Sequence, residues 1–512
     1  LQNQNHPGAN GAFNPTRTNL PSGPNYKMTP ADFPTYVLAD PADRNSNISF
    51  STDDRFTSQG VTLRTFVSAT AGASEDSCTD RTDPLYQTNR RTTPRHGPTV
   101  INAAFNHRNF TDGRAPNTLS LTIYRGAPLT GANITMTNAS LAAQALVPPV
   151  NDSEMSCTGR TWPDIGRRLL KATALKKQTV AADDSVLATY AAAKGLNVTY
   201  ESLIKQAFAS NLWNATGTVA VNGRAFAQAE ANFALFFSLA IQLYEMTLVS
   251  DDAPLDRYFA NYPATTVSNA SALSADQITG MNVFTGSGRC VTCHSGPQLT
   301  NAGTPSYAST SLTSTMRLGD GVTGAYDFGF YNIGVRPTAE DLGVGGTDAN
   351  GAPLSLTRQQ AITGRTAVDG AFKAPNLRNL ALTGPYFHNG SLATLEDVID
   401  FYARGGNSRG TVAANDSGLG TNPTNIGPDI RPLGLAPFEK TALALFLRTA
   451  LLDQRVLYER APFDHPELYI PNGHLGNEST VYNDGFGRAR DSLMLLPATG
   501  KNGSTPLKNF LE

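Results

Sequence analysis

The chain has 512 residues, of which 40% are hydrophobic and only 16% are charged, and its formal net charge is -2. This length allows two or three domains with a substantial core, and the small net charge gives no reason to expect nucleic acid or an anionic membrane surface as a partner. The 45 glycines and 32 prolines predict that much of the chain is loop.

Residues 1–60 are rich in Asn, Pro, Gly and Ser without clear periodicity, which predicts an extended N-terminal arm. No signal peptide precedes Leu1, so we expect a mature chain from which such a peptide has been removed.

Later segments carry apolar residues at helical spacing, which predicts helices over 162–170, 184–194, 200–212, 225–249, 274–284, 395–404 and 437–452. The longest apolar run, Phe233 to Val249, is interrupted by Gln242 and Glu245, so it predicts a buried helix and no transmembrane segment. We expect a domain boundary near 262–275 and loops over most of 297–370.

The strongest motif is Cys290-Val291-Thr292-Cys293-His294, the attachment signature of a c-type haem. Each thiol can add across a haem vinyl group, and the adjoining His294 then becomes the proximal iron ligand. The alternatives are a redox dithiol or half of a zinc site. Zinc would need two further ligands at matching spacing, and no second such pair is present. The Gly-rich flanks do not suggest the βαβ setting of a thioredoxin-like dithiol. The sequence therefore predicts covalent haem.

The two remaining cysteines are Cys78 and Cys157. Thioether attachment of haem takes place outside the cytoplasm, where a leftover pair of thiols oxidises. We therefore predict a Cys78–Cys157 disulfide, with two buried free thiols as the alternative. The same reasoning predicts a periplasmic or extracellular location.

Residues 372–396, from Phe372-Lys373-Ala374-Pro375-Asn376-Leu377-Arg378-Asn379 to Leu395-Glu396, resemble the post-haem signature of the bacterial dihaem cytochrome c peroxidase and MauG superfamily. Residues 98–105 and the Asp-Gly-Arg-Ala sequence at 112–115 agree with it. Residues 455–474 are similar to the rubber-oxygenase-like subgroup.

This resemblance implies a mainly α fold, with two cytochrome c-like helical domains, long loops and few short strands. A first domain over 61–265 would have lost its haem motif, and a second over 266–452 would hold the haem. The tail over 453–512 is expected to pack on the haem domain.

The chain departs from the family upstream of residue 98, where only Cys78 stands in place of a complete attachment motif. Thr111 occupies the position of an aromatic residue that links the two haems in many relatives. Both departures predict one haem c per chain. A first haem held by Cys78 alone, or without covalent attachment by His96 or His107, is the alternative.

Three residues of the first domain match the family's distal peroxide pocket in spacing: Gln144, Pro148 and Glu154. In a peroxidase such a glutamate moves a proton and the glutamine orients peroxide above an open iron. Without iron beneath them, we expect these residues to survive as a packed polar network.

The resemblance also implies a sixth ligand to the remaining iron. By position it falls on His474 of the tail, with Tyr402 as the alternative and His465 or an open site as further ones. Lys373, Arg378 and His388 are expected in the haem environment, the first two offsetting propionate charge. Relatives hold calcium through backbone oxygens at the positions of Thr383 and Pro385, but the accompanying asparagine is His96 here, which disfavours a hard cation.

Three functions stay open at this point. The first is an extracytoplasmic electron-transfer protein, whose partner is a redox protein or a small-molecule electron donor or acceptor. The second is a peroxidase or oxygenase, although the lost first haem argues against ordinary peroxidase turnover. The third is a structural haem protein within an assembly, and self-association is compatible with all three.

Overall fold

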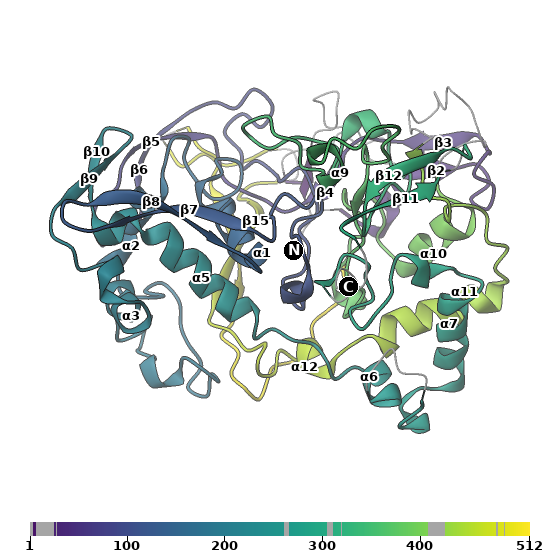
Figure 1. The fold of residues 1–512 in the computed structure, drawn as a ribbon. Coiled ribbons are helices and arrows are strands. Elements are labelled where there is room, and N and C mark those ends of the chain that lie inside the picture. The colour runs from purple at the N-terminus through teal and green to yellow at the C-terminus, as the bar shows by residue number, and fades with distance from the viewer. Residues whose placement is uncertain are drawn as a thin grey trace.

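The computed structural model describes residues 4–6, 25–26, 28–260, 266–304, 311–318, 320–407, 425–477, 480–485 and 487–511. Two lobes lie side by side (Figure 1). The first lobe contains helices α1 (Ser140–Ala145), α2 (Trp162–Leu170), α3 (Tyr200–Ala207), α4 (Gln228–Ala231) and α5 (Phe233–Glu245). The second contains α6 (Pro254–Phe259), α7 (Ala275–Thr285), α9 (Leu356–Gln359), α10 (Leu395–Ala403) and α11 (Pro437–Leu445), and α12 (Gln454–Leu457) follows between the lobes.

The strands form two-stranded antiparallel sheets. The pairs are β1 (Gln4–His6) with β4 (Arg55–Thr57), β2 (Tyr36–Leu38) with β3 (Ile48–Ser51), β5 (Arg64–Ser68) with β6 (Ser77–Asp80), β7 (Leu119–Arg125) with β8 (Thr130–Met136), β9 (Thr218–Val221) with β10 (Arg224–Ala227), β11 (Thr313–Arg317) with β12 (Thr323–Asp327), β13 (Phe330–Tyr331) with β14 (Phe372–Lys373), and β15 (Leu468–His474) with β16 (Asp491–Leu496).

The prediction of a mainly α fold is wrong, because helices account for 26% and strands for 21% of the structure. Several segments expected to be loops form hairpins. Two predicted helices also differ: 184–194 contains only a short 3-10 turn at Ala188–Tyr190, and 225–249 begins with β10 before α4 and α5. Local backbone pairing across short turns overrides the helical spacing there.

Tight packing between α7 and α11 forms the core of the second lobe. The rings of Phe284 and Phe446 lie 5.7 Å apart between centroids. Gly280 allows this approach, because a Cβ atom at that position would lie 2.1 Å from the carbonyl oxygen of Ala442. The partly buried Cys290 packs against the same cluster, so the core of this lobe supports the predicted attachment segment.

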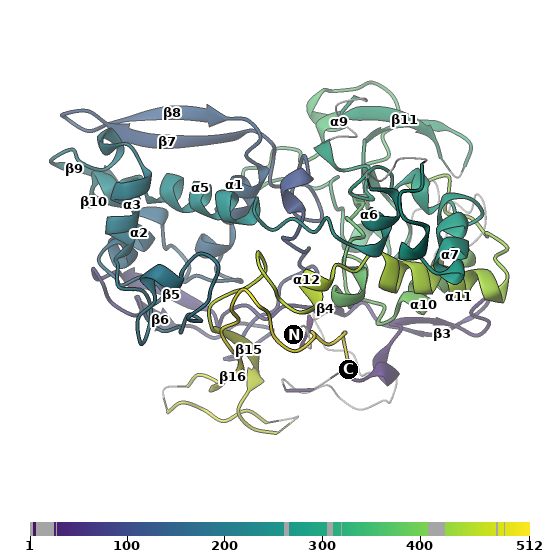
Figure 2. The ribbon, with the colours of Figure 1, turned by 90° about the horizontal axis from the view of Figure 1, so that it is seen from below.

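Each lobe is covered by a segment from the opposite end of the chain. In the N-terminal arm, the N–H of Thr35 donates to Ser391 and that of Phe56 donates to Asn389 of the second lobe, at 3.1 and 2.9 Å. The β15–β16 hairpin instead lies against the first lobe (Figure 2), where Gln178 Nε2 donates to the carbonyl oxygen of Glu467 at 2.7 Å. The hairpin thus lies apart from the haem domain on which the tail was expected to pack, whereas Phe510 near the end of the tail shares a hydrophobic cluster with Ala393 of that domain.

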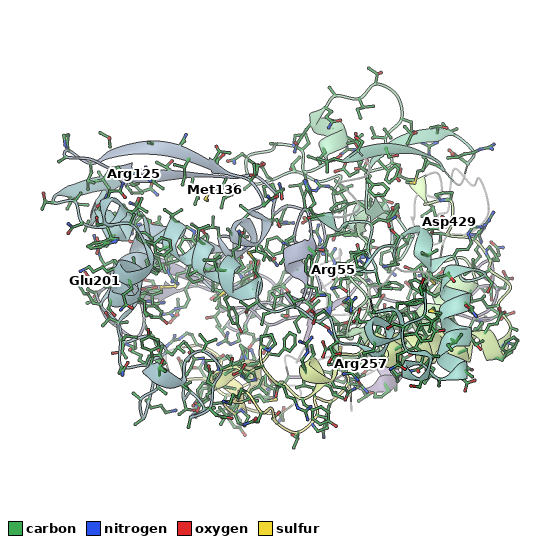
Figure 3. All side chains as sticks on the ribbon, turned by 60° about the horizontal axis from the view of Figure 1, so that its bottom comes forward. Arg55, Arg125, Met136, Glu201, Arg257 and Asp429 are labelled. Atoms are coloured by element: carbon green, nitrogen blue, oxygen red, sulfur yellow. A yellow bond between two sulfur atoms is a disulfide. The ribbon has the colours of Figure 1, made fainter. Side chains whose placement is uncertain are left out.

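The two terminal segments meet again at the end of the described chain, where the rings of Phe33 and Phe510 lie 5.7 Å apart. Arg55 of the arm lies between the two lobes (Figure 3). Among the helices that the structure describes, none has the length and apolar character needed to cross a membrane.

Candidate haem site

A cavity of about 270 Å³ lies in the second lobe, facing the first. Its walls come from the Cys290–His294 segment, from β14 and the loop after it, and from α10 and α11. The wall is largely apolar, with these aliphatic residues on it: Leu377, Leu380, Leu395, Val398, Ile399, Leu443 and Leu447. Cys290, Cys293 and His294 all line it.

The imidazole of His294 is held by two backbone carbonyl groups. Its Nδ1 atom lies 3.0 Å from the oxygen of Leu299 and 3.1 Å from that of Pro375. Because carbonyl oxygens only accept hydrogen bonds, Nδ1 carries the proton and the lone pair of Nε2 is left for a metal. Burial lowers the pKa of His294, so the ring is neutral, as a metal ligand must be.

The two thiols are presented by a 3-10 turn over Cys290–Thr292. Burial raises the pKa of each thiol to about 12, so both are neutral at physiological pH before any attachment.

Asn301 closes this turn, because its Nδ2 atom donates to the carbonyl oxygen of Thr292 at 2.7 Å. The same nitrogen lies 3.0 Å from the hydroxyl oxygen of Tyr331, another residue of the cavity wall. Sequence reasoning missed Asn301 and Tyr331, since neither belongs to a periodic pattern or a ligand motif. The only signal for Asn301 is a polar side chain shortly after the attachment segment.

These residues fit haem c. Two thiols and an imidazole with a free Nε2 meet at the wall of an apolar cavity, which is what thioether attachment and axial ligation require. Lys373 also lines the cavity, is 8% exposed, and has no ion pair within the described part of the chain. A buried ammonium group of this kind suits the carboxylate of a haem propionate.

Tyr402 reaches the cavity from α10, beside the rings of Phe387 and Phe401 at 6.2 and 5.2 Å. Burial, with a smaller effect of Cys293 and Cys290, raises the pKa of its phenol, so the group keeps its proton in the absence of a metal.

The structure places His474, the expected sixth ligand, outside this cavity. Its Nε2 atom accepts a hydrogen bond from the N–H of Arg90 in the first lobe at 3.2 Å. His465 is also engaged elsewhere, with Nε2 lying 3.1 Å from Oε1 of Glu459. Tyr402 is therefore the candidate ligand that the cavity contains.

Of the two other residues expected around the haem, His388 lines the cavity and Arg378 does not. Arg378 does not line the cavity, because its guanidinium forms a paired contact with Asp256 at 2.6 and 2.7 Å. The charge of Arg378 is thus already offset by Asp256, so the expectation that Arg378 binds a haem propionate is wrong. His388 does line the cavity, and its ring is stacked on Phe372 with centroids 3.8 Å apart.

The residues considered for calcium do not fit that ion. The carbonyl oxygen of Thr383 lies 3.1 Å from Nε2 of His96, and burial lowers the pKa of His96 to about 4. At neutral pH the ring is uncharged and its Nε2–H donates to this oxygen, which is one of the two backbone oxygens expected to bind calcium. In the described ranges, no cluster of three or more His, Cys, Asp or Glu residues is arranged to hold a metal.

In the first lobe, the predicted disulfide between Cys78 and Cys157 is confirmed. It leaves Cys78 without a thiol for a haem. Gln144, Pro148 and Glu154 lie outside the large cavity, on and just after α1. Thr111 does reach the cavity wall, and its carbonyl oxygen accepts a hydrogen bond from the N–H of Lys373 at 2.8 Å.

Comparison with known proteins gives one consistent family. The family model for di-haem cytochrome c peroxidase matches residues 68–263. A cytochrome-c peroxidase of Denitromonas iodatirespirans is 32% identical over 213 residues, which cover 40% of this chain and 45% of that protein. The methylamine utilization protein MauG of Methylorubrum extorquens is 29% identical over 225 residues, 44% of this chain and 46% of MauG. The matched regions span about half the length of these relatives.

Among solved structures, a MauG-like protein associated with microbial copper homeostasis covers 75% of this chain and 83% of its own, with 22% identity and a TM-score of 0.39.

Proposed function

Because this chain belongs to the dihaem cytochrome c peroxidase and MauG superfamily, we propose that it is a c-type cytochrome with a single covalent haem that transfers electrons outside the cytoplasm. One observation carries this proposal. The chain has four cysteines; Cys290 and Cys293 line a cavity beside a correctly protonated His294, whereas Cys78 and Cys157 are bonded to each other.

In this assignment Cys290 and Cys293 hold the haem and Nε2 of His294 is the proximal ligand. Tyr402 replaces His474 as the proposed sixth ligand. Of the three candidates His474, Tyr402 and His465, Tyr402 is the one that lines the cavity. When bound, haem c supplies a one-electron redox couple. The chain supplies the apolar surroundings of the haem. An anionic phenolate ligand favours ferric iron and lowers the reduction potential.

Lys373 and His388 are proposed as the polar contacts of the haem edge. An ammonium group with no counterion nearby in the described structure is costly to bury, and burial lowers the pKa of Lys373 to about 8. A propionate carboxylate would offset this cost. The proposed partner is a one-electron donor or acceptor, either a protein or a small molecule.

The test combines haem stoichiometry with reactivity. Intact-mass measurement of the holoprotein is expected to show one haem addition, and an optical titration is expected to show one reversible one-electron step. The reduced protein should bind CO slowly or not at all, because His294 and Tyr402 would both bind the iron in this assignment. Two haem additions or rapid peroxide turnover by the unmodified protein would contradict the proposal, the second in favour of a peroxidase.

A further inference from the structure

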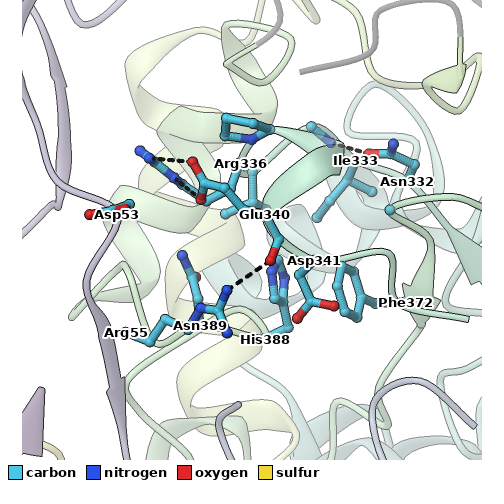
Figure 4. Close-up of a pocket in the computed structure, with 14 residues that line it drawn as sticks. Asp53, Arg55, Asn332, Ile333, Arg336, Glu340, Asp341, Phe372, His388 and Asn389 are labelled. Atoms are coloured by element: carbon cyan, nitrogen blue, oxygen red, sulfur yellow. Dashed lines mark hydrogen bonds and ion pairs between the residues drawn. The ribbon is translucent and has the colours of Figure 1, made fainter. Parts of the chain in front are cut away.

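A small polar pocket of about 20 Å³ adjoins the haem cavity (Figure 4). Its polar wall comes from two distant parts of the chain. Asp53 and Arg55 belong to the N-terminal arm, and Arg336, Glu340 and Asp341 belong to the second lobe. This volume is enough for one ordered water molecule, which needs polar partners of the kind that line this pocket.

The pocket and the haem cavity share part of their wall. Ile333, Phe372 and His388 line both spaces. The imidazole of His388 is stacked on Phe372 at 3.8 Å with an angle of 10° between the ring planes, so the stack fixes its orientation. Within the described residues, no hydrogen bond to a ring nitrogen of His388 is found, and the ring lines both spaces.

The charged groups of the pocket are largely bound to each other. Arg336 forms a paired contact with Glu340 at 2.9 and 3.1 Å, and Arg55 donates to the carbonyl oxygen of Glu340 at 2.9 Å. Arg95 behind them is paired with Asp341. Because opposite charges offset one another, the pocket favours neutral water over a free anion or cation.

The groups that face His388 are Asp341, Arg95, Arg55 and Arg336, together with Lys373 on the adjacent β14. Burial, reinforced by the three arginines and opposed by Asp341, lowers the pKa of His388 to about 3. The imidazole is therefore neutral in this state and can accept a proton when negative charge is added beside it.

We propose that His388 is a proton relay between solvent and the haem cavity, with the polar pocket as its water-filled port. The inference rests on the proposed electron-transfer function. One electron enters from the one-electron donor, and one proton enters from bulk water through the pocket and binds a ring nitrogen of His388. On reoxidation both leave by the same routes, and no other bond is made or broken.

The reason is electrostatic linkage. An added electron makes the haem environment more negative, and in a low-dielectric cavity this raises the proton affinity of a neighbouring imidazole. His388 acts here as a proton-binding group and not as an iron ligand, since Tyr402 and His294 fill those roles in the proposal.

The experiment measures the midpoint potential of the holoprotein by optical titration from acidic to alkaline pH. For the unmodified protein, the potential is expected to fall with rising pH by up to about 59 mV per unit, the tenfold change for one electron. His388→Gln cannot take up this proton and should lose the acidic part of this slope, whereas the contribution of Lys373, whose pKa is about 8, stays the same in both proteins at alkaline pH. His465→Gln is the matched control, because His465 lies on neither cavity and its loss should leave the slope unchanged.

The outcomes are separable. Reversible cycling with a pH-independent potential in the unmodified protein overturns the relay but not the electron-transfer function. An acidic slope in His388→Gln equal to that of the unmodified protein also overturns the relay. Failure of the unmodified haem to cycle reversibly overturns the proposed function, and the relay with it. Should His388→Gln not fold, the unmodified slope and the NMR titration of His388 in the two oxidation states decide the matter, because the relay requires its pKa to rise on reduction.

Discussion

The Nε2 atom of His474 accepts a hydrogen bond from the backbone N–H of Arg90 at 3.2 Å. This bond uses the ring nitrogen that an iron would need, and it ties the β15–β16 hairpin to the first lobe. The N–H of His474 donates in turn to Asn25 at 2.7 Å. His474 thus has the contacts of a buried structural residue, which leaves the sixth ligand to a residue of the haem cavity.

The first prediction follows for the haem spectrum. Tyr402→Phe removes the phenol oxygen and is expected to convert a six-coordinate iron to a high-spin form that binds CO, because phenylalanine offers no ligand atom. His474→Ala is the matched control and should leave the spectrum low spin while lowering stability by about 1–3 kcal/mol through the loss of its buried hydrogen bond. Optical spectra with and without CO check both, and the reverse pattern would restore His474 as the ligand.

The second prediction concerns calcium. Since the carbonyl oxygen of Thr383 is taken by His96, chelation with EGTA is expected to change neither the thermal midpoint nor the haem spectrum. A drop in the midpoint that added calcium reverses would show that the ion is bound after all.

The same histidine gives a pH dependence. Its folded-state pKa of about 4 lies below the unfolded value of about 6.5, so the unfolded chain binds the extra proton. The contribution of His96 is therefore fully present above about pH 6.5 and declines as the pH falls toward 4. His96→Gln keeps an N–H donor and should flatten this part of a urea-unfolding profile against pH.

Several features of the second lobe follow from local patterns in the sequence. The predicted helix over 274–284 forms as α7, Ala275–Thr285, and it begins where Ser274 accepts a hydrogen bond from the N–H of Gln277. The attachment segment could be read directly, because covalent haem needs those residue types at that spacing. Local signals of this kind survive folding because the interacting groups are only a few residues apart.

The rest depends on contacts between distant segments. Nothing near His474 in the sequence indicates that Arg90 and Asn25 hold it, and nothing near Arg378 indicates its pairing with Asp256. The β11–β12 hairpin is hard to predict for a related reason. Its first strand, Thr313–Arg317, is rich in polar and small residues and lacks the alternation of a half-buried strand.

The fourth prediction concerns the disulfide. Cys78 and Cys157 close a loop with a sequence separation of 79, and in the chain-entropy model such a bond stabilises the fold by about 4–5 kcal/mol. The double variant Cys78→Ala/Cys157→Ala should therefore lose most of this amount in urea unfolding. Reduction of the unmodified protein is the matched control and should have a similar effect. Thiol labelling of denatured, unreduced holoprotein should find no free cysteine, and two labelled thiols would contradict the bond.

The last prediction rests on Arg95, which joins the two lobes. Its guanidinium contacts Asp341 of the second lobe at 2.6 and 2.8 Å and also Asp112 of the first. Burial alone would raise the pKa of Asp341, but the hydrogen bonds and charge of Arg95 outweigh it and hold that pKa well below its usual range. The pKa of Asp112 is lowered in the same way, because Arg95 and Arg114 outweigh the effect of burial.

Depressed carboxylate pKa values stabilise the fold above the unfolded value of about 3.9, and this contribution is lost as the pH falls through the folded values. We therefore expect the free energy of unfolding to decline steeply below about pH 4. Asp341→Asn should lower it by about 3 kcal/mol at neutral pH and make the acid decline shallower, because Arg95 is left partly uncompensated. Glu201→Gln removes the partly exposed partner of Lys171 and Lys205 and serves as the control, with an expected loss below about 1 kcal/mol. Urea unfolding of the three proteins at a series of pH values measures both effects, and equal acid slopes for Asp341→Asn and the unmodified protein would show that this contact does not carry the linkage.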